Sequence, residues 1–159
     1  MNNINDAKNY RQQVERGFLF EDLMKDLLIK LKYKNVSQYK KLADNYSADI
    51  IFGELDDLHV VEIKAYRPLS KPSMSVIDEA LKRLQRVLEL SNKFQSGILA
   101  VSTNLDHARY NKLYPNIEIW DLDKILSLAK DFPDIHNKII DLFELDPSYK
   151  ISVDRKSVV

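Results

Sequence analysis

Apolar residues recur at helical spacing in three regions of the chain. Residues 13–32 carry them three and four positions apart, which is typical of one face of an amphipathic helix: Phe20, Leu23, Met24, Leu27, Leu28 and Leu31. Residues 76–94 follow a proline-containing loop and repeat the pattern at Ile77, Leu81, Leu84, Val87 and Leu88. Residues 123–145 predict one or two closing helices, broken near Pro133 because proline has no N–H to donate.

Four shorter segments are typical of β-strands. The runs "ADIIFG" (48–53) and "LHVVEIKAY" (58–66) flank a short acidic turn, so we expect them to pair as a hairpin. The apolar runs "GILAVST" (97–103) and "IEIWDL" (117–122) are typical of buried strands. The predicted order is helix, hairpin, helix, strand, strand and helix.

The composition is that of one globular domain. With 159 residues, 45% of them apolar and 30% charged, the chain can bury a core of its own. We expect the domain to cover residues 1–146 and the polar segment 147–159 to be a tail or linker. The lack of cysteine excludes disulfides and thiolate metal sites and suits a reducing compartment. The sequence has no signal-peptide pattern and no apolar run of membrane-spanning length, so we expect a soluble, cytoplasmic protein with no membrane partner.

Two common kinds of site are not expected. The three histidines, His59, His107 and His136, are scattered without a helical i, i+4 pair, which argues against a histidine zinc site. The three glycines form no phosphate-cradling loop, so nucleotide hydrolysis is effectively excluded.

The strand "HVVEIKAY" contains two charged residues, Glu62 and Lys64, where a sheet core is expected. Burying charge is costly unless the charges are paired, bind a metal or take part in chemistry. If the hairpin centres on Leu55 and Asp56, the numbers of opposed residues sum to about 111, which places Asp49 across from Glu62. Because side chains alternate along a strand, these two carboxylates and Lys64 should share one face.

Two opposed carboxylates repel each other unless a cation lies between them. Mg²⁺ suits this position because it binds one or two carboxylates together with other oxygens, and the Ile63 carbonyl can add one. Lys64 could then orient or deprotonate an attacking water and stabilise negative charge at phosphorus. Glu21, at the edge of the first helix's apolar stripe, could reach the same patch. Gln85 borders the apolar face of its own helix, where an amide could bind a water or a phosphate.

The motifs "GFLFE", "ADIIFG" and "VVEIKAY", followed by a helix, "GILAVST" and "IEIWDLDKIL", resemble the PD-(D/E)XK nuclease superfamily. The resemblance covers residues 17–126 and is strongest to the Mrr-like restriction endonuclease branch. It implies an α/β fold with a mixed central sheet flanked by helices. It also implies metal-dependent hydrolysis of phosphodiester bonds, usually in DNA, with Mg²⁺ or Mn²⁺.

The resemblance also implies a role for each site residue. Asp49 matches the motif's aspartate, Glu62 and Lys64 match its acid-x-lysine, and Glu21 matches the acid often found in the first helix. The motif's proline is Ala48 here. Gln85 resembles a helix glutamine of some branches, although the tyrosine usual four residues later is replaced by glutamate. An effector role in a restriction or defence system follows as an expectation.

Other interpretations stay open at this point. Glu62 and Lys64 could form a surface ion pair on a solvated edge strand, and Asp49 taken alone could be a turn or surface acid. The fold could also serve as a catalytically inactive module for nucleic-acid binding or assembly, and the substrate could be RNA. The segment "KLKYKNVSQYKK" (30–41) fits a nucleic-acid-facing patch or a solvated loop, and we slightly favour the loop.

The net charge is zero, with 24 basic and 24 acidic side chains. Composition therefore gives no support for strong non-specific binding to nucleic acid. If the protein acts on DNA, its cations must be segregated, and the candidates are Arg67, Lys71, Lys82, Arg83 and Arg86. A lone domain should still bind weakly, so we expect a homo-oligomer or tethering to a larger protein.

Overall fold

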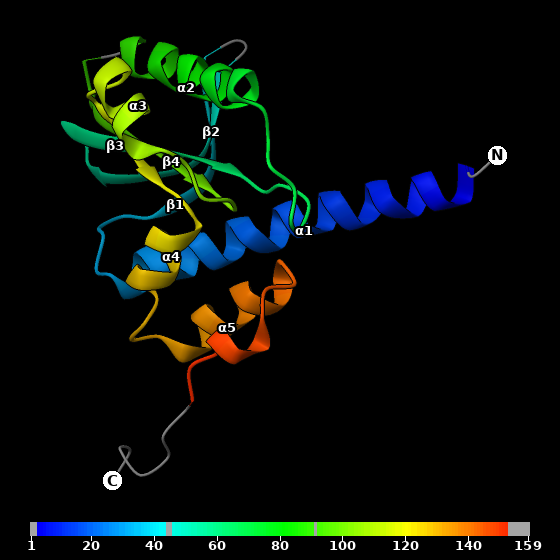
Figure 1. The fold of residues 1–159 in the computed structure, drawn as a ribbon. Coiled ribbons are helices and arrows are strands. Elements are labelled where there is room, and N and C mark those ends of the chain that lie inside the picture. The colour runs from blue at the N-terminus through cyan, green and yellow to red at the C-terminus, as the bar shows by residue number, and fades with distance from the viewer. Residues whose placement is uncertain (1–2, 44–45, 91, 153–159) are drawn as a thin grey trace, which may run out of the picture.

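A computed structural model describes residues 3–43, 46–90 and 92–152 (Figure 1). Its centre is a five-stranded sheet in the order β1-β2-β3-β4-β5. The strands are β1 (Ser37–Ala43), β2 (Tyr46–Glu54), β3 (Asp57–Lys64), β4 (Phe94–Val101) and β5 (Ile117–Trp120). The helices are α1 (Asn3–Lys30), α2 (Met74–Glu89), α3 (His107–Leu113), α4 (Leu122–Leu128) and α5 (Pro133–Leu142), followed by a 3-10 turn, η1 (Pro147–Tyr149).

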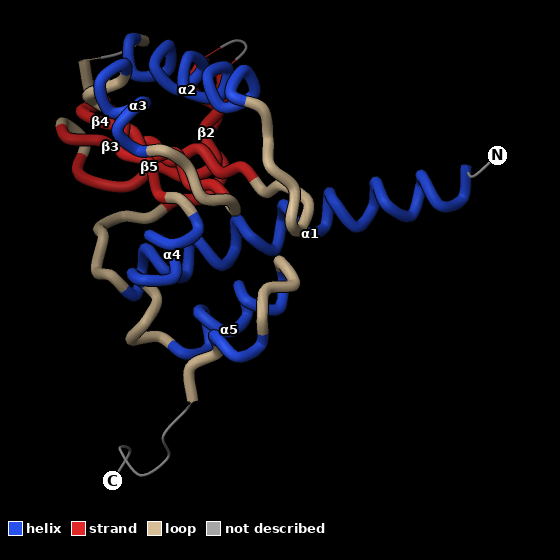
Figure 2. The backbone as a smooth tube through the Cα atoms, viewed as in Figure 1, coloured by secondary structure: helices blue, strands red, loops and turns tan. Residues whose placement is uncertain are grey.

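The sheet is mixed and has helices on both faces, which confirms the expected fold class. Strands β1, β2 and β3 pair antiparallel, whereas β3, β4 and β5 pair parallel. Helices α2 and α3 lie on one face, and α1, α4 and α5 lie on the other (Figure 2). Each face has its own apolar core, because neighbouring strand residues point to opposite sides. Ile50 and Val61 belong to the α1 side, and Ile51 and Val60 to the α2 side.

The hairpin forms in the predicted register. Ile50 pairs with Val61 and Phe52 with His59, so the paired residue numbers sum to 111, as expected from a turn at Leu55 and Asp56. The strand before the turn needs a glycine, because Gly53 has φ +114° and a Cβ there would lie 2.3 Å from the main-chain oxygen of the facing strand. The short turn and this backbone conformation fix which residues face each other at the far end of the hairpin.

Helix α2 is shorter than predicted. It begins after Ser73, whose Oγ accepts the N–H of Val76, and its apolar face packs on the sheet. It ends at Glu89, whereas the predicted segment ran to residue 94. The helical spacing of apolar residues stops at Leu88, and Phe94 pairs with Leu58 as the first residue of β4.

Two elements were not predicted. Residues 37–43 form the edge strand β1, so the expectation of a solvated loop was wrong for that part of segment 30–41. The strand pairs on one side only, with β2, and its sequence shows no clear apolar alternation. Helix α3 has only seven residues, and Tyr110 is its one buried side chain, too little to give a helical pattern.

The closing region forms two helices, as predicted, with Pro133 at the first turn of α5. The segment assigned to the tail begins folded against α5. Asn137 donates to the carbonyl of Ile151 at 2.8 Å and accepts its N–H at 2.9 Å, and Lys150 lies 2.7 Å from Asp141. The rest of the tail, residues 153–159, lies outside the described residues. Within the described ranges, no helix has the length and apolar character required to cross a membrane.

Candidate active site

The central residues of the candidate site lie just past the last paired residues of the β2–β3 hairpin. Asp49 and Glu62 occupy the positions one step beyond the Ile50–Val61 pair. Asp49 is half-buried, and its Oδ2 accepts the main-chain N–H of Ile63 at 2.8 Å. The aspartate is therefore held by the strand that carries Glu62.

Glu62 and Lys64 lie two residues apart on the same face of β3. Glu62 is 7% exposed, and its Oε1 lies 3.2 Å from the Lys64 ammonium, whose side chain is 37% exposed. A solvated edge strand does not describe this pair, because β3 is flanked by β2 and β4 and Glu62 is buried. Lys64 thus connects a buried carboxylate with solvent.

Helix α1 supplies a third carboxyl group. Glu21 lies three and seven residues before Met24 and Leu28, which are fully buried, so the half-buried glutamate shares the core-facing side of the helix. Its carboxyl group shares a hydrogen bond with Asp49 and is close enough to Glu62 to feel its charge. The structure therefore brings together all three acids predicted from the sequence.

The three carboxyl groups shift one another's proton affinity. Burial, the charge of Asp49 and the hydrogen bond to Asp49 raise the pKa of Glu21 to about 7. Burial also raises the pKa of Asp49, although the Ile63 N–H and Lys64 oppose the shift. The pKa of Glu62 is raised by burial and by the charge of Asp49, and Lys64 opposes that shift. The pKa of Glu21 therefore lies near neutral pH, and its proton equilibrium depends on the charge of Asp49 beside it.

One predicted DNA-binding cation also acts on the carboxylates. Arg83 on α2 lowers the pKa of both Asp49 and Glu62 through its positive charge. Its side chain is exposed, so it can also contact a ligand at the site. The sequence indicated Arg83 only as one of several basic residues, because its approach to the strands depends on how α2 packs.

The structure places Gln85 on a different flank of α2 from Arg83. Gln85 lies seven residues after Asp78, which faces Arg109 of α3 at 3.9 Å, so both belong to the α3 side of the helix. Its Nε2 donates to Glu89 Oε1 at 3.3 Å. The amide of Gln85 therefore lies away from the side of the helix that carries Arg83.

The remaining predicted cations are exposed and lie in two places. Arg67 and Lys71 belong to the loop between β3 and α2, and Lys82 and Arg86 belong to the outer surface of α2. The loop starts directly after the strand that carries Lys64, and Gln13 of α1 holds its first residue by donating to the Ala65 carbonyl at 2.8 Å.

Sequence reasoning missed Ser102, which connects β4 to the end of β3. Its N–H donates to the Lys64 carbonyl at 3.1 Å, and its Oγ accepts the N–H of Tyr66 at 2.7 Å. It is 9% exposed. The sequence indicated only that Ser102 lies near the end of the predicted strand "GILAVST". Its hydrogen-bond partners can be inferred only when β4 is known to pair with β3.

The donor set fits a divalent cation held by few protein ligands. Asp49 and Glu62 offer carboxylate oxygens at one position, and burial raises the pKa of both groups although Lys64 and Arg83 oppose the shift. In the described part of the chain, no three or more His, Asp or Glu side chains converge as a ready metal site. Two carboxylates with waters and substrate oxygens are the arrangement usual for Mg²⁺.

A family model for the Mrr-type catalytic domain, described as restriction endonuclease, matches residues 13–129. The chain belongs to this restriction endonuclease family. The match contains Glu21, Asp49, Glu62 and Lys64, and it confirms the Mrr-like resemblance of the sequence. A comparison with curated proteins gave no significant match.

Solved structures with a similar fold accompany this family match. A protein of unknown function, AF1548, aligns with a TM-score of 0.54 at 11% identity, covering 87% of this chain and 72% of its own. The DNA modification-dependent restriction endonuclease AspBHI aligns with a TM-score of 0.45 at 11% identity, covering 78% of this chain. The MspJI restriction endonuclease, in complex with a 27-mer oligonucleotide, aligns with a TM-score of 0.44 at 14% identity, covering 96% of this chain. This chain spans only 33% of the AspBHI chain and 38% of the MspJI chain.

Proposed function

We propose that this member of the restriction endonuclease family is a metal-dependent nuclease of the PD-(D/E)XK type that hydrolyses phosphodiester bonds in DNA. The observation that carries the proposal is the grouping of Asp49, Glu62 and Lys64 at one position of the sheet. Family membership supports the reaction class, and the buried ionisable groups support the location.

Asp49 and Glu62 would hold the metal, Mg²⁺ or Mn²⁺, with the main-chain carbonyl of Ile63 as a further oxygen ligand. When bound, such an ion supplies charge stabilisation at phosphorus and a more acidic water. Asp49 can serve because the Ile63 N–H occupies only Oδ2. Glu62 can serve through Oε2, since the ion pair with Lys64 uses Oε1.

Lys64 would act on the attacking water and on the developing negative charge. Its ammonium group lies beside Glu62 and is partly open to solvent, so it can meet both a water and a phosphate oxygen. Arg83 adds a second cation near the same carboxylates. A phosphodiester bound there would have positive groups on the side of β3 and on the side of α2.

Glu21 would tune the site through its shared proton. With a pKa of about 7, it changes charge near neutral pH and then carries or releases the proton next to Asp49. A bound divalent cation favours the ionised form of all three acids. Glu21 therefore supports the metal-binding pair rather than replacing it.

Binding to the DNA backbone would use exposed cations of the loop after β3 and of α2, namely Arg67, Lys71, Lys82, Arg83 and Arg86. Because acids and bases are equal in number, affinity for duplex DNA should be modest for one domain. Self-association or tethering to a larger protein would raise the effective concentration at the substrate. A role as the effector of a restriction or defence system is consistent with the family.

A catalytically inactive module for nucleic-acid binding or assembly is the second candidate. The ion pair between Lys64 and Glu62 is the observation that favours this module, because a purely structural network would contain the same contact. Incubation of plasmid DNA with the protein and Mg²⁺ or Mn²⁺, with a chelator as control, separates the two. Nicked or linear plasmid only in the presence of metal supports the nuclease, whereas binding without any cleavage supports the module. The same assay with RNA determines the choice of nucleic acid.

A further inference from the structure

Two cavities lie beyond the carboxyl ends of β4 and β5, apart from the three carboxylates. One has a volume of about 420 Å³ and the other of about 580 Å³. They share the lining residues Leu69, Asn104, Leu122 and Leu145, so they form one continuous depression, here called the trough. Volumes of this size are typical of sites for small ligands or parts of larger ones.

The two ends of the trough differ in charge. At the smaller end, Lys71 is the only charged residue among the described lining residues, and Ser70, Ser102 and Thr103 add hydroxyl groups. At the larger end the described lining includes three acids and no lysine or arginine. An anionic group therefore fits the Lys71 end and is disfavoured at the other.

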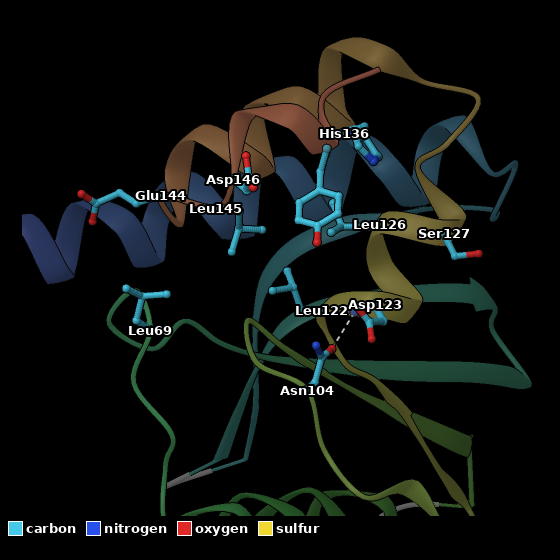
Figure 3. Close-up of a pocket in the computed structure, with 11 residues that line it drawn as sticks. Leu69, Asn104, Leu122, Asp123, Leu126, Ser127, His136, Glu144, Leu145 and Asp146 are labelled. Atoms are coloured by element: carbon cyan, nitrogen blue, oxygen red, sulfur yellow. Dashed lines mark hydrogen bonds between the residues drawn. The ribbon is translucent and has the colours of Figure 1, made fainter. Parts of the chain in front are cut away.

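The middle of the trough is apolar. Figure 3 shows Leu122, Leu126 and Leu145 between the helices, whereas Glu144 points away from them. Asn104 stands at the edge, where its Oδ1 accepts the N–H of Asp123 at 2.8 Å. The Nδ2 group of Asn104 still offers two donors to a ligand. A flat, partly polar group fits between such leucines.

The Lys71 end of the trough adjoins the strand with the proposed catalytic residues. Ser102 lines this end and also binds the main chain of β3 on both sides of Ala65, through the Lys64 carbonyl and the Tyr66 N–H. A phosphate at this end would therefore lie beside the end of β3.

We propose that the trough binds one nucleotide, with its phosphate near Lys71 and Thr103 and its base between Leu122, Leu126 and Leu145. A nucleotide unites the anionic group that fits the Lys71 end and the flat, partly polar ring that fits the apolar middle. It can come from the substrate strand beside the cut bond or from free solution. The first source rests on the proposed nuclease function and is favoured by the connection between Ser102 and β3.

Amide NMR with chelator present tests the proposal without cleavage. The probes are inorganic phosphate, deoxyadenosine monophosphate and a short single-stranded oligodeoxynucleotide. We expect phosphate to shift the amides of Lys71 and Thr103, and the nucleotide and oligonucleotide to shift those of Leu126 and Leu145 as well.

Lys71→Glu should weaken oligonucleotide binding about tenfold, because a charge-assisted contact is lost. Both this change and the control Lys112→Glu concern exposed lysines, and Lys112 lies on α3 at the opposite face of the sheet. Shifts with the monophosphate alone would assign the trough to free nucleotide. Unshifted trough amides, or equal weakening by the two variants, would overturn the proposal.

The trough and the nuclease proposal fail in different ways. Trough shifts without plasmid cleavage in metal would contradict the nuclease and leave the nucleotide site standing. Cleavage with unshifted trough amides would contradict the nucleotide site and leave the nuclease standing. In an active enzyme, Lys71→Glu should raise KM for DNA, since it removes a positive charge that binds the substrate.

Discussion

Asp49 of β2 accepts the main-chain N–H of Ile63 in β3, with 2.8 Å between Oδ2 and N. The bond lies just beyond the Ile50–Val61 pair of the hairpin. It fixes the carboxylate beside Glu62 while leaving Oδ1 for a ligand. Asp49 therefore has a structural contact that is seen and a metal-binding role that is proposed, and these can be separated by mutation.

Asp49→Asn should abolish stabilisation by metal while keeping the fold, because asparagine can still accept the Ile63 N–H but has no negative charge. For the unchanged protein, Mg²⁺ or Mn²⁺ at about 100 times its Kd should raise Tm by roughly 5–10 °C. Thermal melts with and without metal measure this. Asp56→Asn, at the exposed hairpin turn, is the control and should keep the shift. A shift of the same size in Asp49→Asn would place the metal elsewhere.

Metal-free protein should become more stable as the pH falls from about 8 to about 5. The pKa of Glu21 is about 7 in the folded state and 4.5 ordinarily. The stability that the protonated Glu21 contributes to the folded state is thus fully present below the ordinary pKa and is lost as the pH rises through the folded-state pKa. Glu21→Gln should be more stable than the unchanged protein at about pH 8, by roughly 1–2 kcal/mol after allowing for solvent screening, and similar near pH 5.

Urea unfolding at several pH values, with chelator, tests the role of Glu21. Glu15→Gln on the exposed face of α1 is the control and should follow the unchanged protein. If Glu21→Gln kept the full pH dependence between about 5 and 8, the shared proton would have to be assigned to other groups.

Ser102→Ala should destabilise the protein by about 1–3 kcal/mol, because the partly buried N–H of Tyr66 would lose its acceptor. It should also lower kcat for DNA cleavage more than it raises KM, since the strand that carries Lys64 is held less firmly. Ser102→Thr, which keeps the hydroxyl, should restore part of both. Urea unfolding and steady-state kinetics, with Ser152→Ala as an exposed control, measure these effects. Wild-type kinetics in Ser102→Ala would leave Ser102 with a role in stability only.

The sequence was sufficient for the hairpin and its charged residues. A strand repeats every two residues and a short turn fixes the register, so the pairing of Ile50 with Val61, next to Asp49 and Glu62, follows from local information. The amphipathic α1 and α2 followed from the same reasoning with a helical period. These are features in which neighbouring residues in the chain determine the geometry.

Features that depend on distant pairing could not be predicted. The edge strand β1 pairs with one neighbour only, and α3 buries a single side chain, so neither leaves a clear pattern. The contacts of Ser102 require the parallel register between β3 and β4, which is set across a whole helix. The hydrogen bond between Glu21 and Asp49 likewise depends on where α1 crosses the sheet.

One domain should bind duplex DNA weakly and cleave it faster when copies are brought together. The equal numbers of acidic and basic residues limit the phosphate contacts that one domain can make. Fusion to an oligomerising module should raise the cleavage rate steeply at a fixed concentration of domains. Binding titrations at several salt concentrations give the number of contacts. Tight binding by a demonstrated monomer, with a slope that indicates about six or more phosphate contacts, would contradict the need for tethering.

The rate of plasmid cleavage in Mg²⁺ by Glu62→Gln and Lys64→Met, compared with the unchanged protein, tests the central claim most directly. Lys112→Met on α3 is the control for Lys64→Met, and circular dichroism checks the fold of each variant. We predict that both site variants stay folded and lose cleavage by about 100-fold or more, while the control cleaves normally. Cleavage at the unchanged rate by folded Glu62→Gln or Lys64→Met would contradict the assignment of the active site.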